Sequence, residues 1–412
     1  MVINIKKIVF AVFVLQLGCH IKPTEVEKPK VSTQDSIPSS DITAPVVVGA
    51  ARVGEYLPLL GKQGVAIVVN QTSMVGNVHL LDTLLALGVQ VKSIFAPEHG
   101  FRGDADAGEK IDSAKDTKTG LPLYSLYGNT KKPAPETLKD VDWVIFDIQD
   151  VGARFYTYIS TMHYVMEACA EQGKRLMVLD RPNPNGHYVD GPILDMKYHS
   201  FIGMHPIPIV HGMTIGEYAQ MLNGEKWLED SLICTLTVIP CANYTHQTPY
   251  ELPIKPSPNL PNSRAIYLYP SICLFEGTVA SVGRGTDSQF QVYGHPDYSQ
   301  GTYTFTPVPK PGAMHPLLEG KTCRGYDLTG LDPASIRAEA RINLGYILNF
   351  YKNFPHPKDF FLANGFFNKL AGNEILKQQI EAGLSEAEIR KSWENGLNAF
   401  KNKRKKYLLY PE

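Results

Sequence analysis

Residues 95 to 104 read FAPEHGFRGD and bring four polar side chains together directly after an apolar run. Glu98 and His99 can transfer protons, and Arg102 carries a guanidinium fork that suits a carboxylate. A second glutamate, Glu276, lies far along the chain in LFEGT, again beside apolar residues. Two carboxyl groups at one site can divide acid–base work, one as acid and one as nucleophile, base or electrostatic stabiliser. We therefore take Glu98 and Glu276 as a candidate catalytic pair in which Glu98 is the acid.

Secondary structure must position these side chains, and the sequence predicts a regular alternation of strands and helices. From about residue 46, short β-branched runs alternate with helical periodicity. This order predicts an α/β fold whose first domain is a Rossmann-like parallel sheet with strands buried on both faces. The runs are GVAIVVN (64–70), HLLDTLLALG (79–88), VKSIFAPE (91–98), VDWVIFDIQD (141–150), FYTYISTMHYVMEACAEQG (155–173) and RLMVLDRPN (175–183), of which the second and fifth are helical.

Polar residues follow all four predicted strands, at the carboxyl ends where ligands of such sheets bind. One such cluster is as often a helix cap or a turn, but four at one edge indicate a binding site. No GxGxxG follows the first strand, and the Gly-Arg-Gly at 283–285 lacks the P-loop lysine, so no cofactor is expected. The candidates at this edge are Asn70, Glu98, His99, Asp147, Asp150, Asp180 and Asn183.

The first nineteen residues, MVINIKKIVFAVFVLQLGC, have the layout of a secretory signal. Lys6 and Lys7 precede an apolar run that is too short to span a bilayer, and Gly18-Cys19 resembles a bacterial lipobox. We expect an exported protein of the cell envelope or periplasm, anchored by a lipid on Cys19; a simple cleaved signal is the alternative. Residues 20–45 are rich in Pro, Ser, Thr, Lys and Glu, which predicts a disordered tether.

The overall composition excludes one class of partner and suggests two domains. The chain has 412 residues with 40 Lys and Arg against 41 Asp and Glu, a net charge of −1, so nothing favours nucleic acid. Its length suits two domains, which we place at residues 46–250 and 251–412. The cysteines besides Cys19 show no zinc-ligand spacing, although Cys234 and Cys241 could form a disulfide.

Six motifs occur in order along the chain: EHGFRG (98–103), FDIQDVGARFYTY (146–158), DRPNPNG (180–186), PNLPN (258–262), YPSICLFEGT (269–278) and SVGRGT (281–286). Together they resemble the NamZ-type exo-β-N-acetylmuramidases, glycoside hydrolase family 171. The resemblance implies a Rossmann-like domain, a smaller C-terminal α/β domain and an active-site cleft between them. It also implies release of terminal N-acetylmuramic acid (MurNAc) from the non-reducing end of peptidoglycan fragments. The expected partners are then MurNAc-GlcNAc saccharides, with the membrane reached only through the lipid anchor.

The expected substrate also suggests which motif residues contact the sugar. MurNAc carries a lactyl carboxylate that N-acetylglucosamine (GlcNAc) lacks, and arginine binds a carboxylate through two parallel hydrogen bonds. Tyr156 and Tyr158 either stack on the sugar or pack in the core, and Asn259 is a further candidate for binding. The arginines within the motifs are Arg102, Arg154 and Arg284.

The identity of the second carboxylate stays open at this stage. Asp147 or Asp150 could take the role of Glu276, and Glu276 could instead be a structural partner of Arg284 or Arg154. Asp150 could equally hold Arg154. Substitution of each carboxylate in turn is the experiment that ranks them.

Two other classes of function remain as alternatives. A muropeptide-binding lipoprotein without catalysis would use the same cleft only to capture sugar. A metal-dependent hydrolase is the other class, but no HxxxH or HxH spacing accompanies His99, so no metal is expected. Its ligands would come from His99, Asp147, Asp150 and either His211 or His295.

Overall fold

The computed structural model describes residues 44–101 and 114–412, and Ala44–Glu412 form one compact unit. The predicted signal segment, nearly all of the predicted tether, Cys19 and Arg102 lie outside the described residues. Within the described part of the chain, no helix is long and apolar enough to cross a bilayer. The domain boundary near residue 250 stays a prediction.

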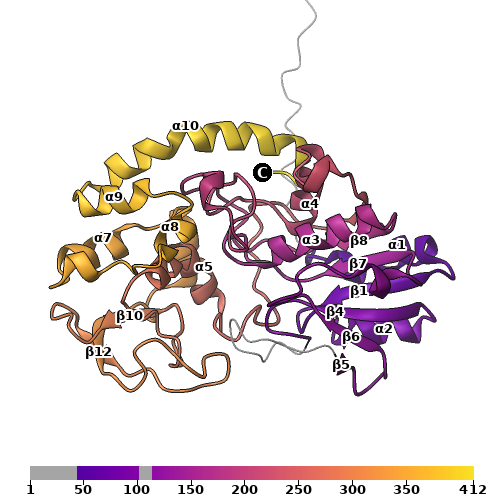
Figure 1. Ribbon diagram of the computed structural model, residues 1–412, viewed down its shortest axis with the longest axis horizontal. Coiled ribbons are helices and arrows are strands. Elements are labelled where there is room, and N and C mark those ends of the chain that lie inside the picture. Colours follow the sequence, from indigo (N-terminus) through magenta and orange to yellow (C-terminus); the bar gives the residue numbers. More distant parts are fainter. Residues whose placement is uncertain (1–43, 102–113) are drawn as a thin grey trace, which may run out of the picture. The chain divides into compact units, whose positions relative to one another are not determined.

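Seven strands form one sheet, and the four strands predicted from apolar runs lie side by side at its centre (Figure 1). All neighbouring strands are parallel except β5 and β6, which confirms the predicted parallel sheet. The flanking strands β5, β6 and β9 were not predicted. In spatial order the strands are β5 (Ala114–Lys115), β6 (Pro122–Ser125), β4 (Gln90–Ala96), β1 (Gly64–Val69), β7 (Trp143–Asp147), β8 (Arg175–Leu179) and β9 (Thr235–Ile239).

Helices pack on both faces of this sheet, because successive strand residues point to opposite sides and nearly all are apolar. The odd-numbered residues of β1 belong to one buried core with α1 (Val53–Leu60) and α2 (Leu80–Ala86). The even-numbered residues belong to a second core with α3 (Tyr158–Glu171) and α4 (Ile215–Gly224). All six residues of β1 are buried, which confirms the expectation of burial on both faces.

The C-terminal part of the chain combines helices with a small antiparallel sheet. Residues 332–351 form two helices, because Ala340 adopts a left-handed conformation with φ 48° and ends the first. Asp332 and Ser385 accept hydrogen bonds as N-caps. The elements are α5 (Ser263–Ile272), β10 (Val292–His295), β11 (Tyr303–Phe305), β12 (Cys323–Asp327), α6 (Pro333–Glu339), α7 (Gly345–Lys352), α8 (Phe366–Ala371), α9 (Ile375–Glu381) and α10 (Glu386–Arg404); a hairpin of β2 (Met74–Val75) and β3 (Val78–His79) lies earlier in the chain.

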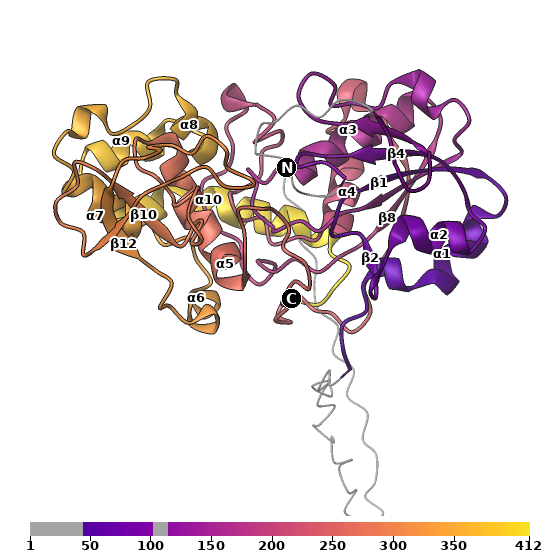
Figure 2. The same ribbon diagram turned by 90° about the horizontal axis from the view of Figure 1, so that it is seen from below.

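The long helix α10 returns from the C-terminal helices to the sheet, and the chain ends against α4 and β8 (Figures 1 and 2). The hydroxyl of Tyr410 donates to Asp180 Oδ2 at 2.5 Å, and the backbone N–H of Leu409 donates to Glu217 Oε1 at 2.8 Å. Asp180 directly follows β8, and Glu217 lies in α4. The last residues of the chain therefore connect the C-terminal helices to the carboxyl edge of the sheet.

The disulfide that the sequence left possible between Cys234 and Cys241 is not formed. Cys234 and Cys241 are both free thiols with different neighbours. Cys234 hydrogen-bonds with Cys169, whereas the thiol of Cys241 donates to the backbone oxygen of Asp180 at 3.3 Å. Sequence spacing gave no sign of this, because Cys169 comes from α3.

Candidate active site

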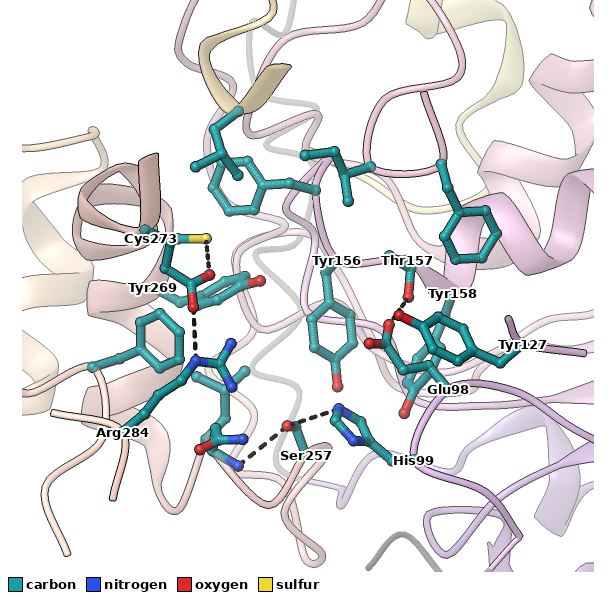
Figure 3. A pocket seen from close by; sticks show the side chains of 18 of the residues that line it. Glu98, His99, Tyr127, Tyr156, Thr157, Tyr158, Ser257, Tyr269, Cys273 and Arg284 are labelled. Atoms are coloured by element: carbon teal, nitrogen blue, oxygen red, sulfur yellow. Dashed lines mark hydrogen bonds and ion pairs between the residues drawn. The ribbon is translucent and has the colours of Figure 1, made fainter. Parts of the chain in front are cut away.

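A cavity of about 400 Å³ lies at the carboxyl edge of the sheet and collects residues from both halves of the chain (Figure 3). Glu98 and His99 follow β4, whereas Glu276 and Arg284 follow α5. In Figure 3, Tyr156 lies between Arg284 on one side and Glu98 on the other. The structure thus brings the two candidate carboxylates to one cavity, as the sequence predicted. The predicted residues that line it are Glu98, His99, Tyr156, Tyr158, Asn259, Glu276 and Arg284.

Glu98 is held by hydroxyl groups. Thr157 Oγ1 donates to Glu98 Oε2 at 2.7 Å, and the phenol of Tyr127 also hydrogen-bonds to Glu98 (Figure 3). Burial, and then the charge and hydrogen bond of Glu98, raise the pKa of Tyr127 above its usual range, so its phenol keeps its proton. A hydroxyl can donate to a carboxylate and can also accept from a carboxylic acid. These partners therefore suit a group that alternates between the two forms.

The turn after Glu98 orients His99 into the cavity. His99 has φ 68° and Gly100 has φ 74°, so two successive residues are left-handed, a conformation that is uncommon for histidine. His99 Nε2 lies 3.3 Å from Ser257 Oγ, which also accepts the backbone N–H of Asn259 at 3.2 Å. Asn259 Nδ2 in turn donates to the backbone oxygen of Gly312 at 2.8 Å. His99 therefore contacts the loop that carries Asn259, another predicted binding residue.

Glu276 is held by a cation and a thiol. It lies on a short 3-10 helix, Cys273–Gly277, that continues from α5. Arg284 Nε donates to Glu276 Oε1 at 2.7 Å, and Cys273 Sγ donates to Glu276 Oε2 at 3.3 Å. Burial lowers the pKa of Arg284, but the neighbouring Glu276 carboxylate raises it, and the net change is upward. Glu276 thus pairs with Arg284, which was one of the open alternatives, and still lines the cavity; Arg154 has other partners.

Tyr156 and Tyr158 form part of the cavity wall and are packed in the core. Their ring centroids are 4.9 Å apart at an interplanar angle of 76°. Tyr156 donates its hydroxyl to the backbone oxygen of Pro256 at 2.8 Å, and Tyr158 accepts from Asn70 Nδ2 at 3.0 Å. Asn70 therefore supports the wall from behind and is not among the lining residues. Because both rings are buried, packing is the role that the geometry favours.

Asp147 and Asp180 follow β7 and β8 but are turned into the protein, outside the cavity lining. Asp147 accepts two hydrogen bonds from Arg181, at 2.6 Å to Nε and 2.9 Å to the terminal nitrogen. Asp180 accepts from Thr214 Oγ1 at 2.7 Å as well as from Tyr410. Burial raises the pKa of Asp180 to about 6, against these hydrogen bonds, which lower it. Both carboxylates are fully buried and hold loops together.

Asp150, Arg154 and Asn183 also lie outside the cavity lining. Asp150 accepts the N–H of Gly152 at 2.7 Å, and burial raises its pKa to about 7. Arg154 does not pair with Asp150, an alternative that the sequence left open; burial lowers the pKa of Arg154 to about 9, and its guanidinium donates to three backbone oxygens. Asn183 donates to the backbone oxygen of Met213 at 2.8 Å. The oxygens that Arg154 contacts belong to Pro192, Ile207 and Leu370.

The ligands suggested for a metal-dependent hydrolase are not brought together. Among the described residues, the only group of acidic, histidine or cysteine side chains close enough to share an ion is Glu167, Glu171 and Glu229, away from the cavity lining. Lys132 Nζ lies 2.9, 2.8 and 3.6 Å from these three carboxylates in turn, so an ammonium group already lies among them and offsets part of their charge. The suggested ligands were His99, Asp147, Asp150, His211 and His295.

Several lining residues were not predicted. Thr157 and Cys273 lie inside the quoted motifs, and the spacing of three residues between Cys273 and Glu276 on one helical turn could have suggested their contact. Tyr127 carried no such signal, because it follows β6, a strand of four residues that begins with proline. The other lining residues that were not predicted are Phe155, Phe201, Ile202, Ser257, Leu260, Tyr269, Phe290, Phe366 and Leu370.

Comparison with known proteins agrees with the motifs. The family model described as Exo-beta-N-acetylmuramidase NamZ, N-terminal, matches residues 65–264, and its C-terminal counterpart matches residues 267–410. A relative named Peptidoglycan beta-N-acetylmuramidase NamZ, from Bacillus subtilis (strain 168), is 43% identical over 339 residues, which are 78% of this chain and 80% of the relative.

Two solved structures of DUF1343 family proteins from Bacteroides fragilis NCTC 9343 are also similar. The first has a TM-score of 0.84 and 52% identity, and the match covers 90% of this chain and 100% of that chain. The second has a TM-score of 0.75 and 27% identity, with 89% and 99% covered. Both agree with an α/β fold that continues into a second, C-terminal part.

Proposed function

Because this chain belongs to the exo-beta-N-acetylmuramidase NamZ family, we propose that its cavity releases terminal MurNAc from the non-reducing end of peptidoglycan fragments during cell-wall turnover. The chain is a glycoside hydrolase. The observation that carries the proposal is the meeting of Glu98 and Glu276 in one cavity, from segments almost two hundred residues apart in the sequence. Glycoside cleavage commonly uses two carboxyl groups that flank the scissile bond.

The surroundings of the two carboxylates support a division of roles between them. Arg284 places a positive charge beside Glu276, an arrangement that suits a nucleophile, a base or a stabiliser of the positive charge that develops on the sugar. The hydroxyls of Thr157 and Tyr127 can hold Glu98 in either protonation state. Glu98 is therefore our choice for the acid that protonates the leaving oxygen.

The lactyl carboxylate of MurNAc needs a cation, and Arg284 can supply one. Its Nε is used by Glu276, while its two terminal nitrogens make no hydrogen bond to the described residues. A planar guanidinium can thus hold the catalytic carboxylate with one edge and a substrate carboxylate with another. Arg102, which lies outside the described residues, stays a candidate for the same role.

Product analysis on a defined MurNAc-GlcNAc disaccharide tests the proposal. We expect free MurNAc and free GlcNAc, and early NMR of the anomeric protons shows whether the configuration is retained or inverted. Binding of the disaccharide without release of MurNAc favours the non-catalytic alternative. Full activity after exhaustive chelation is expected; loss of activity that an added metal restores supports the metal-dependent alternative.

We also propose that the protein is exported to the envelope or periplasm as a lipoprotein anchored through Cys19. Support comes from the sequence alone, namely Lys6 and Lys7, the short apolar run and Gly18-Cys19. Cell fractionation of the wild type and Cys19→Ala tests this. We expect the wild type in the membrane fraction and the variant in soluble form. A membrane-bound variant, or a freely soluble wild type, contradicts the anchor.

A further inference from the structure

Two adjacent lysines on the loop after β6, Lys131 and Lys132, differ in the number of carboxylates around them. Lys132 lies among three carboxylates, as described above, and is neutralised by them. Lys131 is different: no carboxylate of the described residues lies within salt-bridge distance of its ammonium group, and its side chain is only half-buried. Within the described part of the chain, the charge of Lys131 is therefore not balanced by a carboxylate.

An aromatic ring at the cavity defines the position of this cation. Lys131 Nζ lies 4.7 Å from the ring centroid of Phe201, which lines the cavity. A cation over an aromatic face is held by the ring's negative face and keeps its charge. Phe201 is itself fixed, because the ring of Tyr164 stacks against it at 6.3 Å and Ser160 Oγ donates to its backbone oxygen at 2.6 Å.

Lys131 lies at the Glu98 side of the cavity. Tyr127, four residues earlier on the same loop, contacts Glu98, and its ring centroid is 6.0 Å from that of Phe201. Arg284 lies on the other side of Tyr156 (Figure 3). When Arg284 holds the lactyl group of the terminal sugar, the remainder of the substrate extends past Glu98, because the acid must reach the leaving oxygen. That direction leads toward Phe201 and Lys131.

We propose that Lys131, held on Phe201, binds a carboxylate on the aglycone, the part of the substrate that leaves when MurNAc is released. The inference rests on the proposed function. In peptidoglycan fragments such a carboxylate has two sources, the lactyl group of the next MurNAc or the peptide stem attached to it. A lysine is a flexible point charge and accommodates a carboxylate in more than one position.

Lys131→Gln, which removes the charge and keeps most of the length, tests the proposal in the full-length enzyme. kcat/KM is measured on three substrates: MurNAc-GlcNAc, MurNAc-GlcNAc-MurNAc, and the same trisaccharide with a peptide stem. We expect the preference for a carboxylate-bearing trisaccharide over the disaccharide to fall about three- to tenfold, as for a partly exposed charge pair. Lys131→Arg should keep the preference, and so should the control Lys139→Gln, which removes an exposed charge before β7 at the opposite edge of the sheet.

The pattern of loss identifies the source of the carboxylate. Loss confined to the unsubstituted trisaccharide indicates the lactyl group, and loss confined to the peptide-bearing substrate indicates the stem; either result supports the proposal. An equal loss on all three substrates, or no loss on any, overturns it. Failure of the wild type to release MurNAc from the disaccharide contradicts the proposed function instead, whatever Lys131 does.

Discussion

Two carboxylate–arginine pairs with almost the same Nε–oxygen distance serve different purposes in this protein. Arg284 Nε lies 2.7 Å from Glu276 Oε1, and Arg181 Nε lies 2.6 Å from Asp147 Oδ1. The side chains of the first pair are 24% and 22% exposed and line the cavity, whereas those of the second are 4% and 0% exposed. The first pair is open to a substrate, and the second connects the strand ends that frame the cavity.

The comparison shows what decides the role of a carboxylate at the edge of a parallel sheet. Asp147 ends β7 and Arg181 comes soon after β8, so their pair joins neighbouring strands, and Arg181 also donates to the backbone oxygen of Met74 at 3.0 Å. Both carboxylate oxygens of Asp147, and the Nε and one terminal nitrogen of Arg181, are used within the fold. The two terminal nitrogens of Arg284, in contrast, make no hydrogen bond to the described residues. Residues of the same type therefore bind substrate or hold loops according to whether the fold already uses their hydrogen bonds.

The largest expected effect falls on the open pair. Glu276→Gln should fold normally and lose at least about 10²-fold in kcat, because the charge that stabilises the transition state is removed. The measurement is MurNAc release from the disaccharide, with the melting temperature as a control for folding. A variant with near wild-type kcat would mean that Glu276 only holds Arg284.

Substitution within the buried pair, Asp147 and Arg181, should lower the stability of the protein. Asp147→Asn leaves Arg181 buried without a counter-charge, which should lower the free energy of unfolding by about 3 kcal/mol, while kcat of the folded protein changes little. Denaturant unfolding measures the first quantity and titrated active enzyme the second. The double variant Asp147→Leu with Arg181→Met, which leaves no unpaired charge, should be closer to the wild type. A large loss of kcat at full stability would place Asp147 in catalysis.

Asp150 allows a third comparison, which depends on pH. It is a buried carboxyl group, and no cation of the described residues forms an ion pair with it. Its pKa is raised by burial from 3.8 to about 7, so the folded protein binds the proton more tightly than the unfolded chain. Its contribution to stability is therefore full below about pH 4 and is lost as pH rises to about 7. The wild type should lose about 2–3 kcal/mol more than Asp150→Asn between pH 5 and pH 8. Parallel curves of unfolding free energy against pH would contradict this.

The smallest effect concerns the hydroxyl partners of Glu98. Thr157→Val removes the donor at 2.7 Å and keeps the shape of the side chain, so kcat should fall about two- to tenfold. Thr157→Ser keeps the hydroxyl and should retain most of the activity. If both variants lose activity equally, the methyl group of Thr157 matters and its hydrogen bond does not.

The sequence predicted the centre of the sheet and its ligand-binding edge. The central strands are continuous apolar runs because they are buried on both faces, so β1, β4, β7 and β8 were readily recognised. The flanking strand β9 was not predicted, because it is partly exposed and its sequence is not a continuous apolar run. Burial is therefore what made a strand predictable here.

The direction of each side chain at that edge could not be predicted, because it depends on partners distant in the sequence. The carboxylate of Asp180 is turned inward by a hydrogen bond from Tyr410, 230 residues away. Tyr127, which contacts Glu98, follows β6, a strand that the sequence pattern did not predict. Local sequence placed Glu98, Asp147, Asp150 and Asp180 on one edge of the sheet. Only the packing of distant segments separated those that face the cavity from those that hold loops.

The most direct test of the division between Glu98 and Glu276 compares Gln variants of both on two substrates. The disaccharide has a poor leaving group that needs protonation by an acid. The aglycone of a chromogenic MurNAc glycoside is a good leaving group and departs without protonation. We expect Glu98→Gln to lose about 10²–10⁴-fold in kcat on the disaccharide and to recover most of it on the chromogenic substrate, while Glu276→Gln loses activity on both. A Glu98→Gln variant with near wild-type turnover of the disaccharide, or equal losses for both variants on both substrates, would contradict the assignment.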